Sequence, residues 1–237
     1  METKRVWPLD AQNTNELRNK MTEESDLLEN DVLIIDYGVG NISSIINALK
    51  RLNYTYLVSG EEKDIKEAKT YILPGVGNFS EAISNLKQTN IIATLEKEVF
   101  EHKKPILGIC LGMQLLAESS EEDGYHQGLG WIPGKVVKIQ SSENFKVPHV
   151  GWNDLNVKQK SPLFDRLDTN PHFYFDHSYH FQCEEKYIST VCSGDINIVA
   201  SIQHNNIFGV QFHPEKSQNN GLKLFRGFFN YLKETTC

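Results

Sequence analysis

The 237-residue sequence has no long apolar segment and no excess of basic residues. Its apolar runs, such as Val32 to Ile35, extend over only a few residues, whereas a membrane-spanning helix needs about 18 to 20. Lys and Arg number 24 against 31 Asp and Glu, so the formal net charge is −7, and nucleic-acid binding requires a basic face. We therefore expect no membrane and no nucleic acid as the main partner.

Cysteine and glycine motifs of common binding sites are also missing. The four cysteines form no Cys-x-x-Cys pair and show no zinc-type spacing, and the N-terminus has no apolar signal segment. We expect reduced thiols in a cytoplasmic protein. Gly38 and Gly40 do not continue into a Gly-x-Gly-x-x-Gly motif, so the case for a dinucleotide site is weak.

Residues 1–30 differ in composition from the rest of the chain. They hold seven acidic and four basic residues and few large apolar ones. We expect a flexible extension, with a short helix from about Asn15 to Leu28 as an alternative. The remainder, 31–237, is long enough for one large domain but not for two typical ones.

From Asp31 onward, short apolar runs alternate with amphipathic segments, which predicts a three-layer α/β domain around a mainly parallel sheet. Asn205-Asn206 between two late strands predicts a tight hairpin, so antiparallel strands are expected to extend the sheet. Strands are expected at 32–36, 54–58, 71–73, 105–109, 136–140, 173–176, 187–192, 198–203 and 207–212. Helices are expected at 42–52, 79–86 and 91–101, from 113 through 118, and near the C-terminus with Leu222, Phe225, Phe228, Phe229 and Leu232 inward.

One cysteine lies in a sequence typical of a nucleophile elbow. Cys110 stands between Gly108 and Gly112, after an apolar strand and before a predicted helix. Such a turn is too tight for side chains on its neighbours and pushes the nucleophile above the sheet. A helix N-terminus also favours the thiolate. The alternative is an inert thiol buried among strand residues.

A histidine suited to activate this thiol follows the last predicted strand. His213 and Glu215 are two residues apart at the strand end, so both side chains can point to one side. The carboxylate would then orient the imidazole while the imidazole faces the thiol. A lone histidine is more often a surface or core residue, and the elbow is what favours a catalytic interpretation.

Together, Gly108-Ile-Cys110-Leu-Gly-Met-Gln114 and Phe212-His213-Pro-Glu215 resemble the signature of class I glutamine amidotransferases. The resemblance implies a flavodoxin-like fold and a cysteine that attacks the amide of glutamine and releases ammonia. It makes Cys110 the nucleophile, His213 the general acid/base and Glu215 the residue that orients it. It implies no metal and no organic cofactor.

Further segments resemble the glutaminase subunits of imidazole glycerol phosphate synthases. They lie between Val32 and the C-terminus: Asp36-Tyr-Gly-Val-Gly-Asn41, Leu73-Pro-Gly-Val-Gly77, Pro148-His-Val-Gly-Trp-Asn153, Phe173-Tyr-Phe-Asp-His-Ser-Tyr179 and His213-Pro-Glu-Lys-Ser217. This resemblance implies hydrolysis of L-glutamine, and delivery of the ammonia to a (β/α)8 cyclase subunit in a heterodimer for histidine biosynthesis.

The resemblance extends to binding residues. Backbone amides of the loop with Gly75, Val76 and Gly77, together with that of Leu111, are expected to bind the oxyanion; an ordinary loop is the alternative. Expected glutamine-binding positions are Gln114, Glu122, Ser178 and Tyr179. Glu122 is equally well explained as a solvated acid of its charged run. Trp152, Asn153 and Tyr174 match the docking surface for the synthase, since Trp is favoured at interfaces; core packing is the alternative for Trp152.

Three departures leave the partner open. The N-terminal extension is not typical of bacterial members, Asp176 replaces an apolar residue, and His180 follows Tyr179, both in a region expected to face the partner. One alternative is a paralogous glutaminase that supplies ammonia to a sugar amidotransferase of a surface-polysaccharide pathway. Another is a catalytically silent regulatory subunit, which the intact Cys110, His213 and Glu215 argue against.

Overall fold

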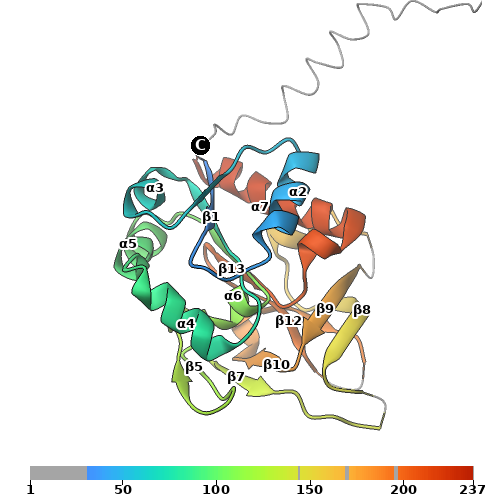
Figure 1. The fold of residues 1–237 in the computed structure, drawn as a ribbon. Helices are drawn as coiled ribbons and strands as arrows, with labels where there is room; N and C mark the ends of the chain where they lie inside the picture. Colours follow the sequence, from blue (N-terminus) through green and yellow to red (C-terminus); the bar gives the residue numbers. More distant parts are fainter. Residues whose placement is uncertain (1–30, 144, 169–170, 195–196, 237) are drawn as a thin grey trace, which may run out of the picture.

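A nine-stranded sheet forms the centre of the domain, in the order β2-β1-β3-β4-β13-β12-β11-β8-β9 (Figure 1). The structure is a computed structural model, which describes residues 31–143, 145–168, 171–194 and 197–236. The five strands at one side of the sheet, β2, β1, β3, β4 and β13, are parallel to one another. The other four, β12, β11, β8 and β9, each pair antiparallel with the strand before them in the sheet order. This confirms the predicted parallel core with antiparallel strands added.

The parallel strands are short, and all except the half-buried edge strand β2 are fully buried, as the apolar runs predict. They are β1 (Val32–Ile35), β2 (Leu57–Ser59), β3 (Thr70–Leu73), β4 (Ile106–Ile109) and β13 (Ile207–Val210). The antiparallel strands are β8 (His149–Val157), β9 (His172–His177), β11 (Ile188–Cys192) and β12 (Val199–His204). Asn205, with φ +54°, forms the predicted tight turn between β12 and β13.

Helices cover both faces of the sheet, which makes three layers (Figure 1). Along β1, Val32 and Ile34 pack with α2 (Ile42–Arg51) and α7 (Gln218–Thr236). Leu33 and Ile35 point to the other face, where α3 (Glu62–Glu67), α4 (Phe79–Gln88) and α5 (Ile92–Glu96) lie. Alternate residues of a buried strand therefore supply two separate cores, as the side-chain period of two requires.

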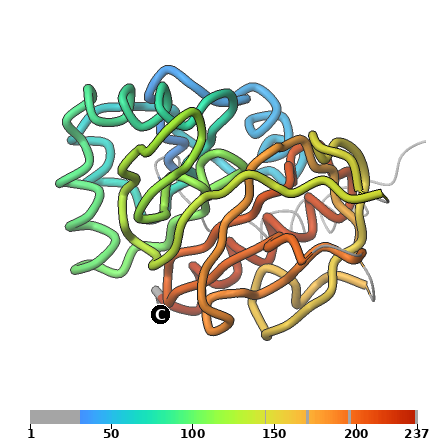
Figure 2. The backbone as a smooth tube through the Cα atoms, turned by 90° about the horizontal axis from the view of Figure 1, so that it is seen from below, coloured from blue at the N-terminus to red at the C-terminus, as the bar shows by residue number. Residues whose placement is uncertain are grey.

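A smaller four-stranded sheet adjoins the carboxyl ends of the parallel strands. Its order is β10 (Tyr179–Gln182), β7 (Lys135–Lys138), β5 (Ser119–Ser120) and β6 (His126–Gln127). Seen from below, the chain from about residue 130 to 143 runs across the front of the domain (Figure 2). Ser178 alone separates β9 from β10, so the chain passes there from the large sheet to the small one.

Several predicted boundaries differ from the structure. The helix predicted through residue 118 is wrong beyond α6 (Leu111–Gln114), because the chain turns at 115–118 into β5. β2 begins at Leu57, three residues after the predicted start of this strand. The predicted 91–101 helix is α5 continued by a π-helical turn, Lys97–Glu101. α3, β8 and the small-sheet strands β5, β6 and β10 were not predicted, and the possible helix at 15–28 lies outside the described residues.

The C-terminal helix α7 packs as its apolar periodicity predicts. Phe225, Phe228, Phe229 and Leu232 are buried in the core, and Leu222 packs against it half-buried. Phe228 lies edge-on to Phe208 of β13 at a centroid distance of 5.7 Å. The helix thus packs against β13, the strand that leads to His213.

Candidate active site

Cys110 lies at a strained turn between β4 and α6. Its φ of +54° and ψ of −111° are rarely adopted by a residue with a side chain. Its amide donates to the carbonyl of Val210 at 2.8 Å, which ties the turn to β13. A Cβ on Gly108 would lie 2.7 Å from the carbonyl oxygen of Gly112, so the flanking glycines are sterically required. The predicted elbow geometry is therefore present.

His213 and Glu215 follow β13 and form a buried pair. The Nδ1 atom of His213 lies 2.8 Å from Oε1 of Glu215. Since a carboxylate accepts only, Nδ1 carries the proton and Nε2 is left for Cys110. Burial lowers the pKa of His213, but hydrogen bonds to Cys110 and Glu215 and their charges outweigh it and raise the pKa to about 10. The imidazole is thus suited to hold a proton beside the sulfur.

The main chain around His213 is held on both sides. Its amide donates to the carbonyl of Tyr174 at 2.9 Å, and the hydroxyl of Ser217 donates to its carbonyl at 2.6 Å. The same hydroxyl accepts from the amide of Tyr174 at 3.0 Å. Ser217 thereby links the histidine loop to β9, a role that the sequence did not indicate.

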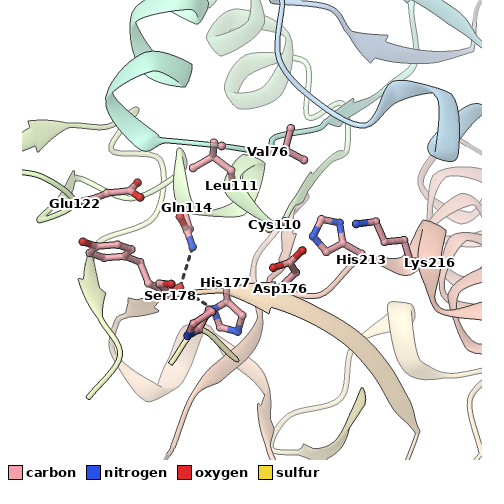
Figure 3. A pocket seen from close by; sticks show the side chains of 13 residues that line it. Val76, Cys110, Leu111, Gln114, Glu122, Asp176, His177, Ser178, His213 and Lys216 are labelled. Atoms are coloured by element: carbon pink, nitrogen blue, oxygen red, sulfur yellow. Dashed lines mark hydrogen bonds between the residues drawn. The ribbon is translucent and has the colours of Figure 1, made fainter. Parts of the chain in front are cut away.

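A cavity of about 290 Å³ opens beside the thiol (Figure 3). Its walls include nine of the residues predicted for the site: Val76, Gly77, Cys110, Leu111, Gln114, Glu122, Ser178, Tyr179 and His213. Glu215 stands behind His213. Four lining residues were not predicted as site residues: Pro148, Asp176, His177 and Lys216.

The loop after β3 lies directly on the elbow. A Cβ on Gly75 would lie 2.5 Å from the amide nitrogen of Gly112, so only glycine allows this approach. The hydroxyl of Tyr37 donates to the carbonyl of Pro74 at 2.6 Å and anchors the start of the loop. Val76 is 39% exposed at the cavity edge, and Gly77 has φ +91°. Such a loop can present backbone amides to a developing oxyanion.

Two buried glutamines connect the thiol to the opposite wall. The Gln114 amide donates to the carbonyl of Tyr179 and to Oε1 of Gln211, both at 3.0 Å. Gln211 in turn donates to the Cys110 sulfur, at an N···S distance of 3.8 Å. Sequence reasoning missed Gln211; the available signal was a lone polar residue between Val210 and Phe212. The structure buries Gln211 completely.

Glu122 lies in the wall of the cavity and is half-buried there. Its carboxylate accepts from the amide of Phe79 at 2.7 Å, at the start of α4. Burial raises the pKa of Glu122, and the neighbouring Asp123 adds to that rise. The carboxylate therefore joins the small sheet to the loop that precedes α4.

The three predicted docking residues lie on β8 and β9, outside the cavity. Trp152 is 46% exposed and packs edge-on against Tyr174, with centroids 6.1 Å apart. Core packing of Trp152 is therefore wrong. Asp176 is exposed at the cavity mouth, but His180 is buried on β10 beside a separate cavity. The expectation that His180 faces a partner is wrong, because β10 turns its side chain inward.

In the described part of the chain, no three His, Cys, Asp or Glu side chains are placed to hold a metal ion. No helix there is long and apolar enough to cross a bilayer. What the site does offer is a buried imidazole–carboxylate pair, a thiol and a small polar cavity. That set suits nucleophilic acyl transfer.

A profile of the glutamine amidotransferase class-I family matches residues 33–231. The chain is 50% identical over 203 residues to imidazole glycerol phosphate synthase subunit HisH 2 of Vibrio vulnificus, covering 85% of this chain and 95% of that one. It is 44% identical over 197 residues to subunit HisH 1 of Campylobacter jejuni, covering 83% and 98%. A subunit HisH 2 of Methanococcus maripaludis is 44% identical over 198 residues, covering 83% and 98%.

Solved structures share the fold at lower identity. A glutamine amidotransferase superposes with a TM-score of 0.67 at 18% identity, covering 85% of this chain and 98% of that one. PurLQS from Thermotoga maritima gives a TM-score of 0.64 at 21% identity, with coverage of 85% and 98%.

Proposed function

Because the chain belongs to the class I glutamine amidotransferase family, we propose that it is the glutaminase subunit of an imidazole glycerol phosphate synthase. The observation that carries this proposal is the Cys110–His213–Glu215 arrangement beside the cavity. Relatives at 44–50% identity that bear that subunit's name support the choice within the family. The substrate is L-glutamine and the products are glutamate and ammonia.

In the proposed reaction, the Cys110 thiolate attacks the side-chain carboxamide carbon of glutamine. His213, protonated between the sulfur and Glu215, donates its proton to the departing nitrogen, and ammonia leaves. His213 then takes a proton from a water molecule that attacks the glutamyl thioester, which releases glutamate and restores the Cys110 thiolate beside a protonated His213. The raised pKa of His213 supports this role, since a protonated imidazole is available at neutral pH.

Backbone amides are assigned to the oxyanion of the tetrahedral intermediate. Leu111 follows the nucleophile at the start of α6, and Val76 belongs to the loop that packs on the elbow through Gly75. Loss of one such donor costs about 10²- to 10³-fold in kcat in hydrolases of this type. Tyr37 supports the loop by holding the Pro74 carbonyl.

Glutamine is proposed to bind along the wall that leads from Cys110 to β10. Gln114, Glu122 and the Ser178–Tyr179 segment line this wall. The Ser178 carbonyl is already used by the amide of Ile139 at 2.9 Å. We assign the amino-acid end of the substrate to the backbone amides of this segment and to the Ser178 hydroxyl.

The partner is proposed to be a (β/α)8 cyclase subunit in a cytoplasmic heterodimer. It would dock on the surface formed by Trp152, Asn153 and Tyr174, where the exposed Trp152 packs against the half-buried Tyr174 and supports an interface. Ammonia has to be passed through the complex, because in neutral water it is mostly ammonium, which is not a nucleophile. The complex would thus act as a lyase with a built-in ammonia source. Residues 1–30 remain predicted to be an extension outside the amidotransferase domain of 31–237.

A second candidate keeps the chemistry and changes the acceptor. Relatives named HisH 1 and HisH 2 indicate organisms with more than one such subunit. The exposed Asp176 at the cavity mouth departs from the family pattern in the region that faces the partner. A paralogue supplying a sugar amidotransferase would have a docking surface altered in this way.

Glutamate release from L-glutamine tests both proposals. The chain is assayed alone, with its organism's cyclase subunit, and with that subunit plus the ribonucleotide ligand. We expect strong stimulation by the liganded subunit, and Cys110→Ala is expected to abolish release while its circular dichroism stays unchanged. Glutamate release that depends on Cys110 but is not stimulated by the cyclase subunit would favour the second candidate. Undiminished release by Cys110→Ala would contradict the glutaminase assignment.

A further inference from the structure

Two buried histidines, His149 and His177, face each other across the pair of strands β8 and β9. They are direct register partners, and both are less than a tenth exposed. Nδ1 of His149 lies 2.9 Å from Nε2 of His177. Neither belongs to the proposed catalytic group, yet His177 lines the cavity. Buried polar side chains that the chemistry does not use require another explanation.

The pair continues in both directions as one chain of hydrogen bonds. At the inner end, Nδ1 of His177 lies 2.8 Å from the carbonyl oxygen of Tyr179 (Figure 3). At the outer end, the side-chain amide nitrogen Nδ2 of Asn153 lies 3.3 Å from Nε2 of His149. Gly151, with φ +131°, lies midway between these two residues of β8. This series of hydrogen bonds therefore runs from the proposed docking surface to the cavity wall where glutamine is proposed to bind.

With both rings neutral, the Tyr179 carbonyl sets the donor and acceptor roles in this series of hydrogen bonds. The Tyr179 carbonyl only accepts, so Nδ1 of His177 carries a proton and its Nε2 accepts from Nδ1 of His149. Nε2 of His149 then accepts from the Asn153 amide. All three bonds are satisfied when both imidazoles are neutral and protonated on Nδ1. An added proton on His177 would turn its Nε2 into a donor facing another donor.

The environment agrees with two neutral rings. Burial lowers the pKa of His149 to about 4 and that of His177 to about 3. His149 is also stacked on Phe175 at a centroid distance of 4.7 Å. An imidazole held by packing and by two hydrogen bonds has a fixed position, which is what a positioning residue needs.

We propose that His149 and His177 are positioning residues, which hold the Ser178–Tyr179 segment against the glutamine pocket through a relay of neutral imidazoles anchored at Asn153. The inference rests on the proposed glutaminase function. The Tyr179 carbonyl is the junction, because it accepts from His177 and from Gln114. Through Gln114 and Gln211 the relay reaches the Cys110 sulfur.

The first test is independent of activity and uses the full-length wild-type chain labelled with ¹⁵N-histidine. At pH 7, nitrogen chemical shifts and couplings report which ring nitrogen carries the proton. We expect His149 and His177 both to be neutral and protonated on Nδ1, the less common tautomer. A cationic ring or a proton on Nε2 of either residue would overturn the relay, whether or not the chain hydrolyses glutamine.

The second test separates the two ends of His177. In His177→Asn the amide takes the place of Nδ1, whereas in His177→Gln it takes the place of Nε2. We expect His177→Gln to raise the KM for glutamine about tenfold with less than about threefold change in kcat, and His177→Asn to recover most of that affinity. The control is His204→Gln, in a histidine that contacts Tyr187 away from the cavity.

The outcomes of the kinetic test are distinct. If the wild-type complex releases no glutamate, the proposed function fails and the tautomer measurement alone decides the relay. If the wild type is active and both His177 variants keep its KM, or share one raised KM, the positioning role is refuted while the glutaminase assignment stands.

Discussion

Gly112→Ala tests the packing on which the elbow depends. A Cβ at residue 112 would lie 2.0 Å from the carbonyl oxygen of Leu73, and 3.2 Å from the carbonyl carbon of Pro74. The first distance is more than an ångström short of ordinary contact, and both partners are backbone, so no side chain can move aside. We expect the free energy of unfolding to fall by about 3 kcal/mol, the upper range for overpacking.

The same substitution should disable the site more than it destabilises the fold. Relief of the clash moves α6, with Leu111, away from the loop of Gly75 and Val76 by about 1 Å, and a misplacement of that size costs about 100-fold in rate. Urea unfolding and glutamate release measure the two effects. Gly130→Ala is the control: its Cβ would meet no atom within 4 Å, so any loss of stability there measures only the strain of a side chain at φ +70°, and kcat should be unchanged. Wild-type stability and kcat in Gly112→Ala would refute the packing argument.

Three further substitutions test separate parts of the account. Glu215→Gln removes one of the two groups, Cys110 and Glu215, that raise the pKa of His213 to about 10. A raised pKa stabilises the fold below pH 6.5, and that contribution is lost as pH rises through about 10. The excess unfolding free energy of wild type over variant should therefore shrink between those values, and a constant excess would contradict this. Tyr37→Phe leaves the Pro74 carbonyl unpaired, so we expect a loss of about 1–3 kcal/mol in unfolding free energy and a lower kcat; unchanged values of both would show that the bond does not hold the loop. Trp152→Ala should reduce stimulation by the cyclase subunit at least about tenfold with little change in melting temperature, and equal stimulation would remove this residue from the interface.

The layers of the fold were predictable because short buried strands carry their own signal. The run of Val32 to Ile35 is apolar on both faces, and the periodicity of α7 is unbroken. β8 was not predicted because Gly151 and several polar residues interrupt the alternation of apolar and polar residues that marks a strand. The helix after Cys110 was predicted too long because residues 115–117 are apolar, but their burial comes from the turn toward the small sheet.

The proposed catalytic residues were identified by local spacing, but their surroundings were not. Cys110 lies in a motif that can be read in sequence, and so does the pair at 213 and 215. Gln211 and His177 act through partners about 100 and 28 residues away in the chain, Cys110 and His149. Such contacts depend on strand register, which no local pattern in a single sequence fixes.

Covalent labelling with a glutamine-analogue alkylator tests the central claim most directly. The full-length chain is incubated with the chloroketone analogue of glutamine, and the modified peptide is mapped by mass spectrometry with and without excess L-glutamine. Cys183 is a useful internal comparison, since it is more exposed than Cys110 but burial beside Glu184 raises its pKa to about 11. The account predicts a single adduct on Cys110 that glutamine suppresses. Labelling of Cys183 in preference to Cys110, or labelling that glutamine does not suppress, would contradict it.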